Sequence, residues 1–337
     1  MKKNLKIDDM KVTTKEIAAL CGVSIGTVDR ALHNRGGINA ATRERILAVA
    51  KERGYRPHLL ARSLKQGRTM TIGVAIFELD NPFFSQLVTA IEAHAYASGY
   101  FVYLTITDGD PREERAYLER LAGLNVDGIL LFPVNGGDDF ADFLKQLNTP
   151  VVTIGNRVSE TLPFVGIKDR QAMKDAIVYI AAKGYQHIIY VSPPLEYQDK
   201  ENIYSVEERL AGYEEGLAVL PMHVPPIILR NKRYLEHLEK MPLDFPKTAI
   251  LCSSDIYALE ILNLFRHRGI RVPEDVGLIG FDNIKALKYV VPTLTTIGYP
   301  IQEMGKRGVD CLLAQINSTP VAMTTLLDHV IIEGRSL

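Results

Sequence analysis

The chain has 337 residues, of which 47% are hydrophobic and 23% charged, a composition typical of a globular protein with two or three domains. Its three cysteines are scattered and form no C-x-x-C pair, which argues against a disulfide framework and a zinc site, and no metal or other cofactor is predicted. The N-terminal segment lacks the apolar core of a signal peptide, and no apolar run is long enough to cross a bilayer. We therefore expect a cytoplasmic protein with no membrane partner.

The net charge of −1 conceals an uneven distribution along the chain. Residues 1–70 contain 15 Lys and Arg against 6 Asp and Glu, a net charge of +9, whereas the remainder contains 24 against 34, a net charge of −10. A basic segment with helical periodicity on an acidic body indicates that this head alone binds a polyanion, and nucleic acid in particular.

Three short helices are predicted in the basic head, each after a capping residue: Thr13, Ser24 and Asn39. Thr13 begins a capping box, and Gly22 and the glycine pair at 36–37 are the expected stops of the first two helices. The positions expected to be buried are Ile17, Leu20, Cys21, Val28, Ala31, Leu32, Ile46, Leu47, Val49 and Ala50.

A fourth short segment, "YRPHLLARSLKQGRT", has Pro57 in its first turn and Gly67 at its end. A helix this short is not stable without a core beside it. We therefore predict a linker that becomes ordered only with a partner.

From Thr69 onward, short apolar runs such as "TIGVAIF" and "VDGILLFPV" alternate with amphipathic helices, a pattern that predicts parallel α/β sheets. The alternation resumes after "FVGIKD", so we predict two similar α/β lobes. The C-terminal "VDCLLAQIN" helix and "TTLLDHVIIEG" strand are expected to cross back between the lobes. A ligand would occupy the cleft that faces the carboxyl ends of the strands.

Residues 22–26, Gly-Val-Ser-Ile-Gly, match the G-x-S-x-G pattern of a hydrolase nucleophile. That pattern requires a strand before the serine, whereas a helix is predicted before Ser24. The chain also contains no G-x-G-x-x-G or G-x-x-x-x-G-K-[ST] motif for a nucleotide. We therefore interpret Ser24 as a helix cap and expect no enzymatic activity.

Two short helices around a glycine are typical of a helix-turn-helix, whose second helix enters the major groove of DNA. On its first turn, Ser24 and Thr27 can donate hydrogen bonds to phosphate. Ile25 and Gly26 occupy the exposed positions that usually face base edges, yet neither side chain can form a hydrogen bond. Arg30 can pair with guanine in bidentate fashion, with a solvated helix face as the alternative.

The segment "VTTKEIAALCGVSIGTVDRALHN", followed by "TRERILAVAKERGYRPHLLARSLKQGRTMTIGV", resembles the start of a LacI/GalR-family transcriptional regulator. The resemblance continues through "DNPFF", "VDGILL", "ERLAGY", "SSDIYALEIL", "RVPEDVGLIGFDN" and "PTLTTIGYPIQEMG", and so covers nearly the whole chain. It implies a small all-α helix-turn-helix headpiece over 11–56 and a hinge helix over 57–68. Over 69–337 it implies a two-lobed α/β core, similar to periplasmic sugar-binding proteins, that binds an effector and forms a homodimer or a tetramer.

The same resemblance implies which residues contact DNA. The recognition helix would run from Ser24 to Arg30, and Leu64 resembles an apolar wedge that two subunits insert into the minor groove, with packing on the core as the alternative. Asp29 stands where the family commonly has serine, and we expect it to pair with Arg30 or another base of the head rather than with DNA. The expected DNA contacts are Thr13, Ser24, Ile25, Gly26, Thr27, Arg30, Asn34, His58, Arg62 and Leu64.

In the core, the resemblance places effector contacts especially at Arg209, expected at the start of the helix after the fifth strand, and at Asp282, at a strand end. A structural salt bridge or a strand-end cap is the alternative for both. Tyr204 is a weaker candidate. The expected ligand contacts are Asn81, Phe83, Phe84, Arg209, Asp255 and Asp282, with core packing as the alternative for the two phenylalanines.

These observations predict a transcriptional regulator, a repressor that binds double-stranded operator DNA and responds to a small effector, a sugar or a related polyol. Two alternatives remain open: a regulator that uses the effector as a corepressor, and a sugar-binding protein that does not bind DNA. An enzyme with an α/β fold is disfavoured, because the predicted cleft offers acids and an arginine but no activated nucleophile, metal cluster or phosphate loop.

Overall fold

The computed structural model describes residues 12–55, 67–192, 203–220, 226–241 and 247–337. The chain forms two compact units, Met1–Thr69 and Met70–Leu337, which we describe separately as the head and the core. Across the described ranges, we find no helix that is both long and apolar enough to cross a membrane. Most of the predicted hinge helix lies outside the described residues.

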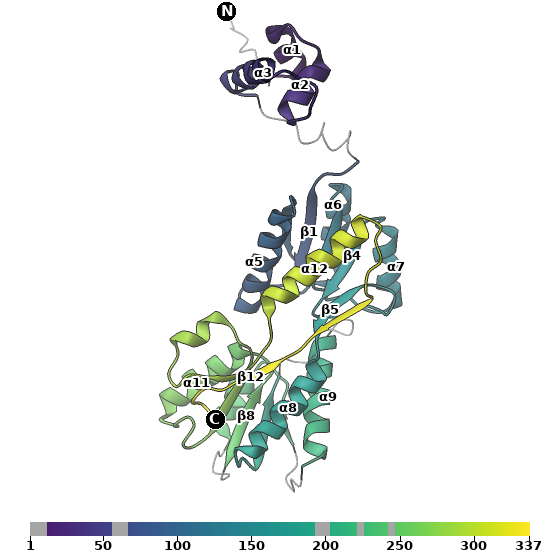
Figure 1. The fold of residues 1–337 in the computed structure, drawn as a ribbon. Helices are drawn as coiled ribbons and strands as arrows, with labels where there is room; N and C mark the ends of the chain where they lie inside the picture. The colour runs from purple at the N-terminus through teal and green to yellow at the C-terminus, as the bar shows by residue number, and fades with distance from the viewer. Residues whose placement is uncertain (1–11, 56–66, 193–202, 221–225, 242–246) are drawn as a thin grey trace, which may run out of the picture. The chain divides into compact units, whose positions relative to one another are not determined.

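The head consists of helices packed around a small apolar core (Figure 1). These helices are α1 (Thr14–Cys21), α2 (Ile25–Leu32) and α3 (Ala40–Glu52). The side chains of Thr13, Ser24 and Asn39 each accept a hydrogen bond from a backbone N–H of the following helix, as predicted. Glu16 completes the predicted capping box. The buried residues are Ile17, Ala18, Cys21, Val28, Ala31, Ile46 and Ala50.

Three predictions for the head are wrong. Leu20 and Leu47 are exposed over 53% and 43% of their surfaces, because a unit of short helices buries only one narrow face of each helix. The second helix ends at Leu32, before the glycine pair at 36–37. Asn34 already has the left-handed conformation that ends a helix, with φ of 53°.

The core contains two mainly parallel sheets, one in each lobe, as the α/β alternation predicts (Figure 1). The N-lobe sheet has the order β11-β5-β4-β3-β1-β2, with β1 (Thr71–Ile76), β2 (Phe101–Ile106), β3 (Gly128–Leu131), β4 (Val151–Ile154), β5 (Phe164–Ile167) and β11 (Thr324–Leu327). The C-lobe sheet has the order β12-β10-β9-β8-β6-β7, with β6 (His187–Val191), β7 (Ile227–Leu229), β8 (Thr248–Cys252), β9 (Gly277–Asp282), β10 (Thr295–Gly298) and β12 (Val330–Ile332). Only β10 and β12 pair in antiparallel fashion among these strands.

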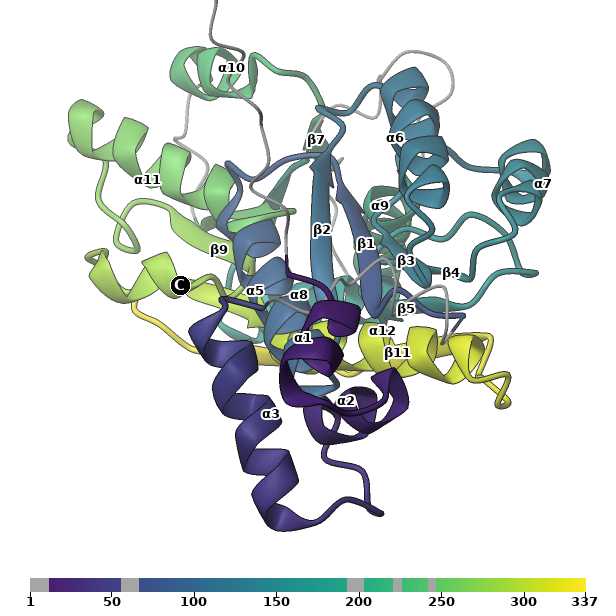
Figure 2. The same cartoon turned by 90° about the horizontal axis from the view of Figure 1, so that it is seen from above.

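Helices cover both faces of the N-lobe sheet (Figure 2), which explains why strands such as β3 and β4 are buried along their whole length. One face packs against α6 (Pro111–Gly123) and α7 (Asp138–Gln146), and the other against α5 (Pro82–Ala97) and α12 (Ile301–Ile316). The C-lobe helices are α8 (Asp169–Ala182), α9 (Tyr204–Ala218), α10 (Tyr234–Lys240) and α11 (Asp255–Arg268), with a short 3₁₀ helix η1 (Lys285–Tyr289).

The chain passes between the lobes three times, between β5 and α8, between β10 and α12, and between β11 and β12. The C-terminal segment crosses back as predicted, but it forms two strands rather than one. Thr324–Leu327 joins the N-lobe sheet and Val330–Ile332 the C-lobe sheet. The crossings carry Asp169 and Tyr299, so these two residues stand at the boundary of both lobes.

Helices α8 and α9 approach each other closely at Gly212. A Cβ atom on Gly212 would lie 2.2 Å from the backbone carbonyl oxygen of Arg170, so a larger residue would not fit. This contact sets the first turn of α8 beside the third turn of α9, one turn beyond Arg209. Asp169 and Arg209 are thereby brought together.

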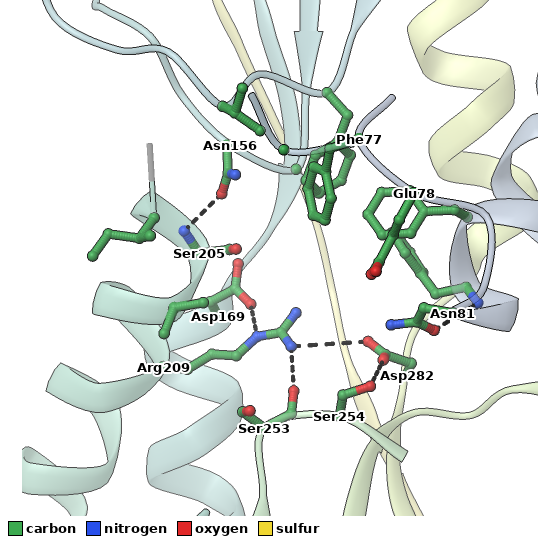
Figure 3. A pocket seen from close by; sticks show the side chains of 18 of the residues that line it. Phe77, Glu78, Asn81, Asn156, Asp169, Ser205, Arg209, Ser253, Ser254 and Asp282 are labelled. Atoms are coloured by element: carbon green, nitrogen blue, oxygen red, sulfur yellow. Dashed lines mark hydrogen bonds and ion pairs between the residues drawn. The ribbon is translucent and has the colours of Figure 1, made fainter. Parts of the chain in front are cut away.

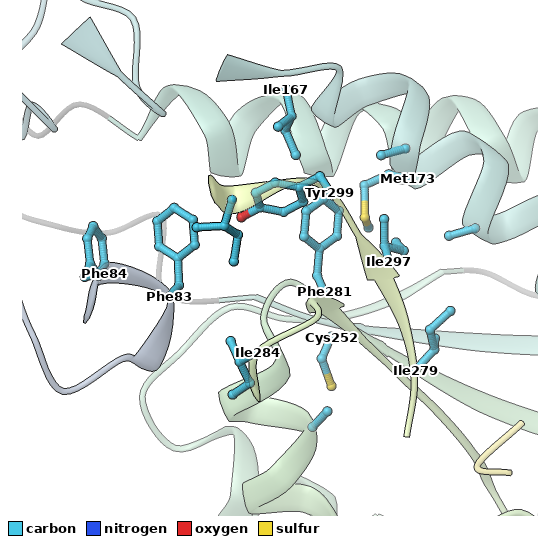
Figure 4. Packing of buried hydrophobic residues seen from close by; sticks show 14 of the residues in the cluster. Phe83, Phe84, Ile167, Met173, Cys252, Ile279, Phe281, Ile284, Ile297 and Tyr299 are labelled. Atoms are coloured by element: carbon cyan, nitrogen blue, oxygen red, sulfur yellow. The ribbon is translucent and has the colours of Figure 1, made fainter. Parts of the chain in front are cut away.

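A single apolar cluster extends through both lobes (Figure 4). Phe83 at the start of α5 lies with its ring centroid 6.1 Å from that of Tyr299, and the Tyr299 ring lies 5.9 Å from Phe281 at the end of β9. The boundary between the lobes therefore rests on packed rings.

Candidate functional site

Five of the residues predicted to contact DNA, Ser24, Ile25, Gly26, Thr27 and Arg30, lie on α2 or at its N-cap. The Ser24 hydroxyl oxygen accepts a hydrogen bond from the backbone N–H of Thr27 at 3.2 Å, and the two hydroxyl oxygens lie 2.9 Å apart. Ile25 is 51% exposed and Gly26 is also at the surface. Ser24 follows a helix rather than a strand, so it lacks the strained strand-to-helix turn of a nucleophile.

Arg30 is exposed, and its Nε donates a hydrogen bond to the backbone carbonyl of Gly26 at 3.2 Å, so the side chain lies back along α2 toward the first turn. Asp29 pairs with Arg35 rather than with Arg30, with Nη1 and Oδ2 3.5 Å apart. Asp29 was predicted to pair with Arg30 or with another basic residue of the head, and Arg35 is such a residue.

Thr13 and Asn34 hold helix ends. Thr13 caps α1, and the Asn34 side-chain carbonyl accepts a hydrogen bond from Arg43 Nη1 at 2.8 Å. Their contacts with DNA remain predictions. The predicted contacts at His58, Arg62 and Leu64 lie outside the described residues.

In the core, a cavity of about 420 Å³ opens between the lobes (Figure 3). Its walls come from the carboxyl ends of strands in both sheets. Phe77 follows β1, Phe132 follows β3, Ser253 follows β8 and Tyr299 follows β10. A ligand in this cavity would contact both lobes at once, at the position where open α/β sheets bind ligands.

Arg209 is the centre of the polar wall (Figure 3). Its Nε donates to Asp169 Oδ1 at 2.7 Å, and its Nη1 donates to the Ser253 carbonyl at 2.5 Å and lies 3.9 Å from Asp282 Oδ1. The guanidinium also lies over the Phe281 ring, 3.7 Å from its centroid. Side-chain exposure is 14% for Arg209, 3% for Asp169 and 5% for Asp282, so these charges are buried and compensate one another.

Asp282 is held by more than the arginine. It accepts hydrogen bonds from the Tyr299 hydroxyl at 2.8 Å and from the Ser254 hydroxyl at 2.9 Å. Its φ of 110° is a conformation that side chains rarely adopt, and such strain is typical of ligand sites. The end of β9 therefore presents this carboxylate in a fixed orientation.

Burial disfavours the charged forms of both carboxylates. It raises the pKa of Asp169 to about 6, although the neighbouring Arg209 acts in the opposite direction. Burial also raises the pKa of Asp282, opposed by Arg209 and by the Tyr299 and Ser254 hydroxyls. Hydrogen-bond donors of a ligand would further stabilise the ionised forms.

The N-lobe wall is aromatic. The Phe77 ring lies 4.6 Å from Phe84 and 5.4 Å from Phe132, and the Phe83 ring lies 5.0 Å from Phe84, all in edge-to-face arrangements. Phe83 and Phe84 are almost fully buried and also line the cavity, so the ligand-contact and core-packing interpretations both apply to them. This wall offers apolar surface to one side of a ligand.

Of the predicted ligand contacts, Asn81, Phe83, Phe84, Arg209 and Asp282 line the cavity. Arg209 lies in the second turn of α9, after β6, rather than at the start of the helix after the fifth strand. Tyr204 does not line the cavity, and its ring instead lies 5.5 Å from that of Phe164.

The prediction for Asp255 is corrected, because this residue does not line the cavity. It is the first residue of α11, and its carboxylate accepts hydrogen bonds from Thr296 Oγ1 at 2.6 Å and from the Ile284 backbone N–H at 2.9 Å. The missing side chain of Gly280 makes room for it, since a Cβ there would lie 2.1 Å from Asp255 Oδ1. Asp255 therefore holds the C-lobe together.

Several residues that line the cavity were not predicted from the sequence. Tyr299 directly follows β10 and Asp169 begins α8 two residues after β5, at two of the crossings, and Phe77, Phe132 and Asn156 come within two residues of the ends of three N-lobe strands. Their position just after a predicted strand was the signal in the sequence that could have identified them as cavity residues. Asn156 also links the lobes, because its side-chain carbonyl accepts a hydrogen bond from the Ser205 backbone N–H of α9 at 3.0 Å.

Nothing in the described part of the chain groups three or more His, Cys, Asp or Glu side chains in a way that could hold a metal ion. The wall around Arg209 carries hydrogen-bonding charges, and the N-lobe wall carries the phenylalanine rings together with the carboxylates of Glu78, Asp80 and Asp108. Such a site suits a small molecule with several hydroxyl groups and an apolar face.

Comparison with known proteins agrees with both units. Residues 13–58 match the family model "Bacterial regulatory proteins, lacI family", and residues 177–337 match "Periplasmic binding protein-like domain". The chain is 32% identical to the HTH-type transcriptional repressor CytR of Escherichia coli, over 98% of this chain and 97% of the relative.

Two solved structures show the same fold. A Lac repressor dimer bound to operator and the anti-inducer ONPF matches 96% of this chain and 98% of its own with a TM-score of 0.84 at 25% identity. A LacI-family transcriptional regulator from Enterococcus faecium with bound ribose matches 79% of this chain and 98% of its own, with a TM-score of 0.69 at 27% identity.

Proposed function

Because this chain belongs to the LacI family of bacterial regulatory proteins, we propose that it represses transcription by binding operator DNA and that a small molecule in the interlobe cavity controls this binding. The family membership confirms the resemblance found in the sequence, and the helix-turn-helix head and two-lobed core confirm the predicted fold class. The family consists of transcriptional regulators and not of enzymes, in agreement with Ser24 as a helix cap.

In this proposal, α2 is the recognition helix. Ser24 and Thr27 bind phosphate, while Ile25 and Gly26 face the base edges and Arg30 reads guanine. The exposure of Ile25 supports this orientation, because a large apolar side chain on a free helix can contact thymine methyl groups. The remaining proposed contacts are Thr13, Asn34, His58, Arg62 and Leu64.

The effector that we propose is a sugar or a related polyol. Buried Arg209 can donate hydrogen bonds to the effector's hydroxyls and buried Asp282 can accept hydrogen bonds from them. The Phe83 side chain would cover an apolar face of the sugar ring. The ribose bound to the Enterococcus faecium regulator supports this class of ligand. Asn81 and Phe84 complete the proposed contacts.

We further propose a cytoplasmic homodimer, and a tetramer if two dimers pair. Two recognition helices on one palindromic site follow from this symmetry, and the matched Lac repressor dimer on its operator supports it. The effector would act as an inducer, with corepression as the alternative. A sugar-binding protein without DNA binding is less consistent with the net charge of +9 in residues 1–70.

The observation that carries the proposal is the buried Arg209 between Asp169 and Asp282 at the cavity wall. The experiment is a thermal-shift screen of the full chain against sugars, polyols and sugar phosphates, because a ligand that binds only the folded state raises Tm. Asp282→Asn should abolish the shift caused by any hit. A hit whose shift survives that substitution would place the effector elsewhere.

Two experiments test DNA binding: the dependence of affinity on salt concentration, and the substitution of Leu64 in the proposed hinge helix. Affinity should fall linearly with the logarithm of salt concentration, because bound phosphates release counterions. Leu64→Ala should weaken binding to the operator, because the wedge opens the minor groove. Operator affinity that does not depend on salt, or that Leu64→Ala leaves intact, contradicts the proposed mode of binding.

A further inference from the structure

The cavity carries far more negative than positive charge. Arg209 is the one cation among its described lining residues. The carboxylates that line it are Glu78, Asp80, Asp108, Asp169 and Asp282. Since Arg209 is already bound to Asp169 and close to Asp282, no described cation of the wall is left to balance the other three.

Glu78 is the most informative of these carboxylates. It lies in the loop between β1 and α5, is partly buried and forms no ion pair with the described residues. Figure 3 shows its carboxylate directed into the cavity between Phe77 and Asn81, on the opposite side from Arg209. Burial, and then the nearby charge of Asp80, raise the pKa of Glu78, and a cation bound beside this carboxylate would oppose both effects.

The rings next to Glu78 suit the same kind of ligand group. Phe77 precedes Glu78 in the chain and packs edge to face on Phe84 and Phe132. The face of a phenyl ring attracts a cation, and this attraction strengthens when water is excluded. A carboxylate beside aromatic rings is therefore a favourable environment for a protonated amine.

We propose that the effector is a polyhydroxylated molecule that carries a cationic nitrogen, with the nitrogen against Glu78 and the hydroxyls against Arg209 and Asp282. This inference rests on the proposed function, since it names the chemical class of the same effector. A phosphate or carboxylate on the ligand would meet five carboxylates and an arginine that is already paired. The cavity therefore rejects anionic derivatives of the same skeleton.

The test compares matched ligands on the full chain. Three series, built on ribose, glucose and galactose, each contain the parent sugar, an aminodeoxy sugar and the sugar phosphate, at a pH where the amine is protonated. Calorimetric titration should show an aminodeoxy sugar binding about 10-fold to 100-fold more tightly than its parent, and no binding of the phosphates. The inference is overturned if a parent sugar or phosphate binds as tightly as the amine, or if no aminodeoxy sugar binds.

The variant Glu78→Gln should reduce the ratio between amine and parent affinities toward one. Glu119→Gln is the matched control, because Glu119 is an exposed carboxylate on α6 outside the cavity, and it should keep the ratio of the unmodified chain. A ratio that Glu78→Gln leaves unchanged contradicts the inference, and the ligand series on the unmodified chain decides it if this variant does not fold. A neutral sugar that binds and changes operator affinity would overturn only this inference, whereas ligands that never change operator affinity would overturn the proposed function.

Discussion

The head and the core place their functional groups in opposite ways. Around α2 five candidate DNA contacts lie at or partly at the surface, fall within the seven positions 24–30 and are oriented by a helix cap. In the core, Arg209, Asp169 and Asp282 are buried and come from distant parts of the chain. Substitutions of the DNA contacts in the head should therefore have little effect on folding, whereas the ligand contacts in the core also stabilise the packing between the lobes.

The largest expected effect follows from removing the central charge of the core. Arg209→Ala leaves two buried carboxylates without their cation, which should lower the free energy of unfolding by about 3–5 kcal/mol and abolish effector binding. The matched control is Arg307→Ala, which removes an exposed ion pair with Glu303 and should cost at most about 1 kcal/mol. Urea unfolding measures the free energy of unfolding of both variants. Equal losses in the two variants would contradict a stabilising role of the buried ion pairs of Arg209.

Another buried carboxylate, Glu114, predicts that the stability of the core depends on pH. Glu114 accepts hydrogen bonds from the Val134 and Asn135 backbone N–H groups, at 2.8 and 2.9 Å, and so supports the cavity wall at Val134. Burial raises its pKa from 4.5 to about 7, opposed by its hydrogen bonds with Asn135 and Val134. Between these values the folded state holds a proton that the unfolded state has lost, so the free energy of unfolding falls as pH rises from about 4.5 to about 7.

The size of this change is of the order of 3 kcal/mol. Glu114→Gln cannot ionise, so its stability should fall less steeply over the same pH range. Burial raises the pKa of Asp169 to about 6, so Asp169 also makes the free energy of unfolding fall as pH rises. Because this effect is the same in both proteins, the difference between their pH profiles reports on Glu114. Parallel pH profiles of the two proteins, measured by urea unfolding, would contradict the prediction.

The head and the core should also differ in how they tolerate the replacement of a glycine. Gly212→Ala places a Cβ 2.2 Å from the Arg170 carbonyl oxygen, so α8 and α9 must separate, at a cost of about 1–3 kcal/mol. Gly26→Ala is the control in the head, where the nearest atom to the new Cβ is 3.9 Å away. It should keep the stability of the head and change only DNA binding. Thermal unfolding and operator titration of both variants check this, and a greater loss of stability for Gly26→Ala would reverse the comparison.

The smallest expected effects are on DNA recognition. They distinguish a residue that reads bases from a residue that binds phosphate. Arg30→Ala should reduce discrimination between operator and mismatched DNA by about 1–3 kcal/mol, because the bidentate contact to guanine is lost. Ser24→Ala should weaken binding to all sequences alike, by about 0.5–2 kcal/mol, because it removes a helix cap and a phosphate contact. Binding to operator and scrambled duplexes distinguishes these outcomes, and the reverse pattern would exchange the two roles.

The same contrast explains what could be predicted from the sequence. The caps at Thr13, Ser24 and Asn39 were predictable, because each depends on a few neighbouring residues. The burial of Leu20 was predicted wrongly, because periodicity does not tell how wide a face the neighbouring helices cover. In the head, local rules therefore gave the elements but not the limits of the core.

In the core, Arg209 and Asp282 were found through the family resemblance, while Asp169 and Tyr299 were missed. Their importance depends on the close contact of α8 and α9 and on the crossings between the lobes, which no local pattern reveals. Asp255 was misassigned because its carboxylate accepts hydrogen bonds within the C-lobe, from Thr296 and Ile284, and does not line the cavity. Tertiary packing decides these cases.

The central claim is that the buried cavity of the core controls DNA binding by the exposed helix of the head. It is tested most directly by titrating the full chain with a fluorescent duplex that it has selected from random sequences, in the absence and presence of a saturating ligand found by thermal shift. The ligand should change Kd for this duplex by about 5-fold to 150-fold, and Asp282→Asn should remove the change. A Kd that is the same with and without the bound ligand would contradict it.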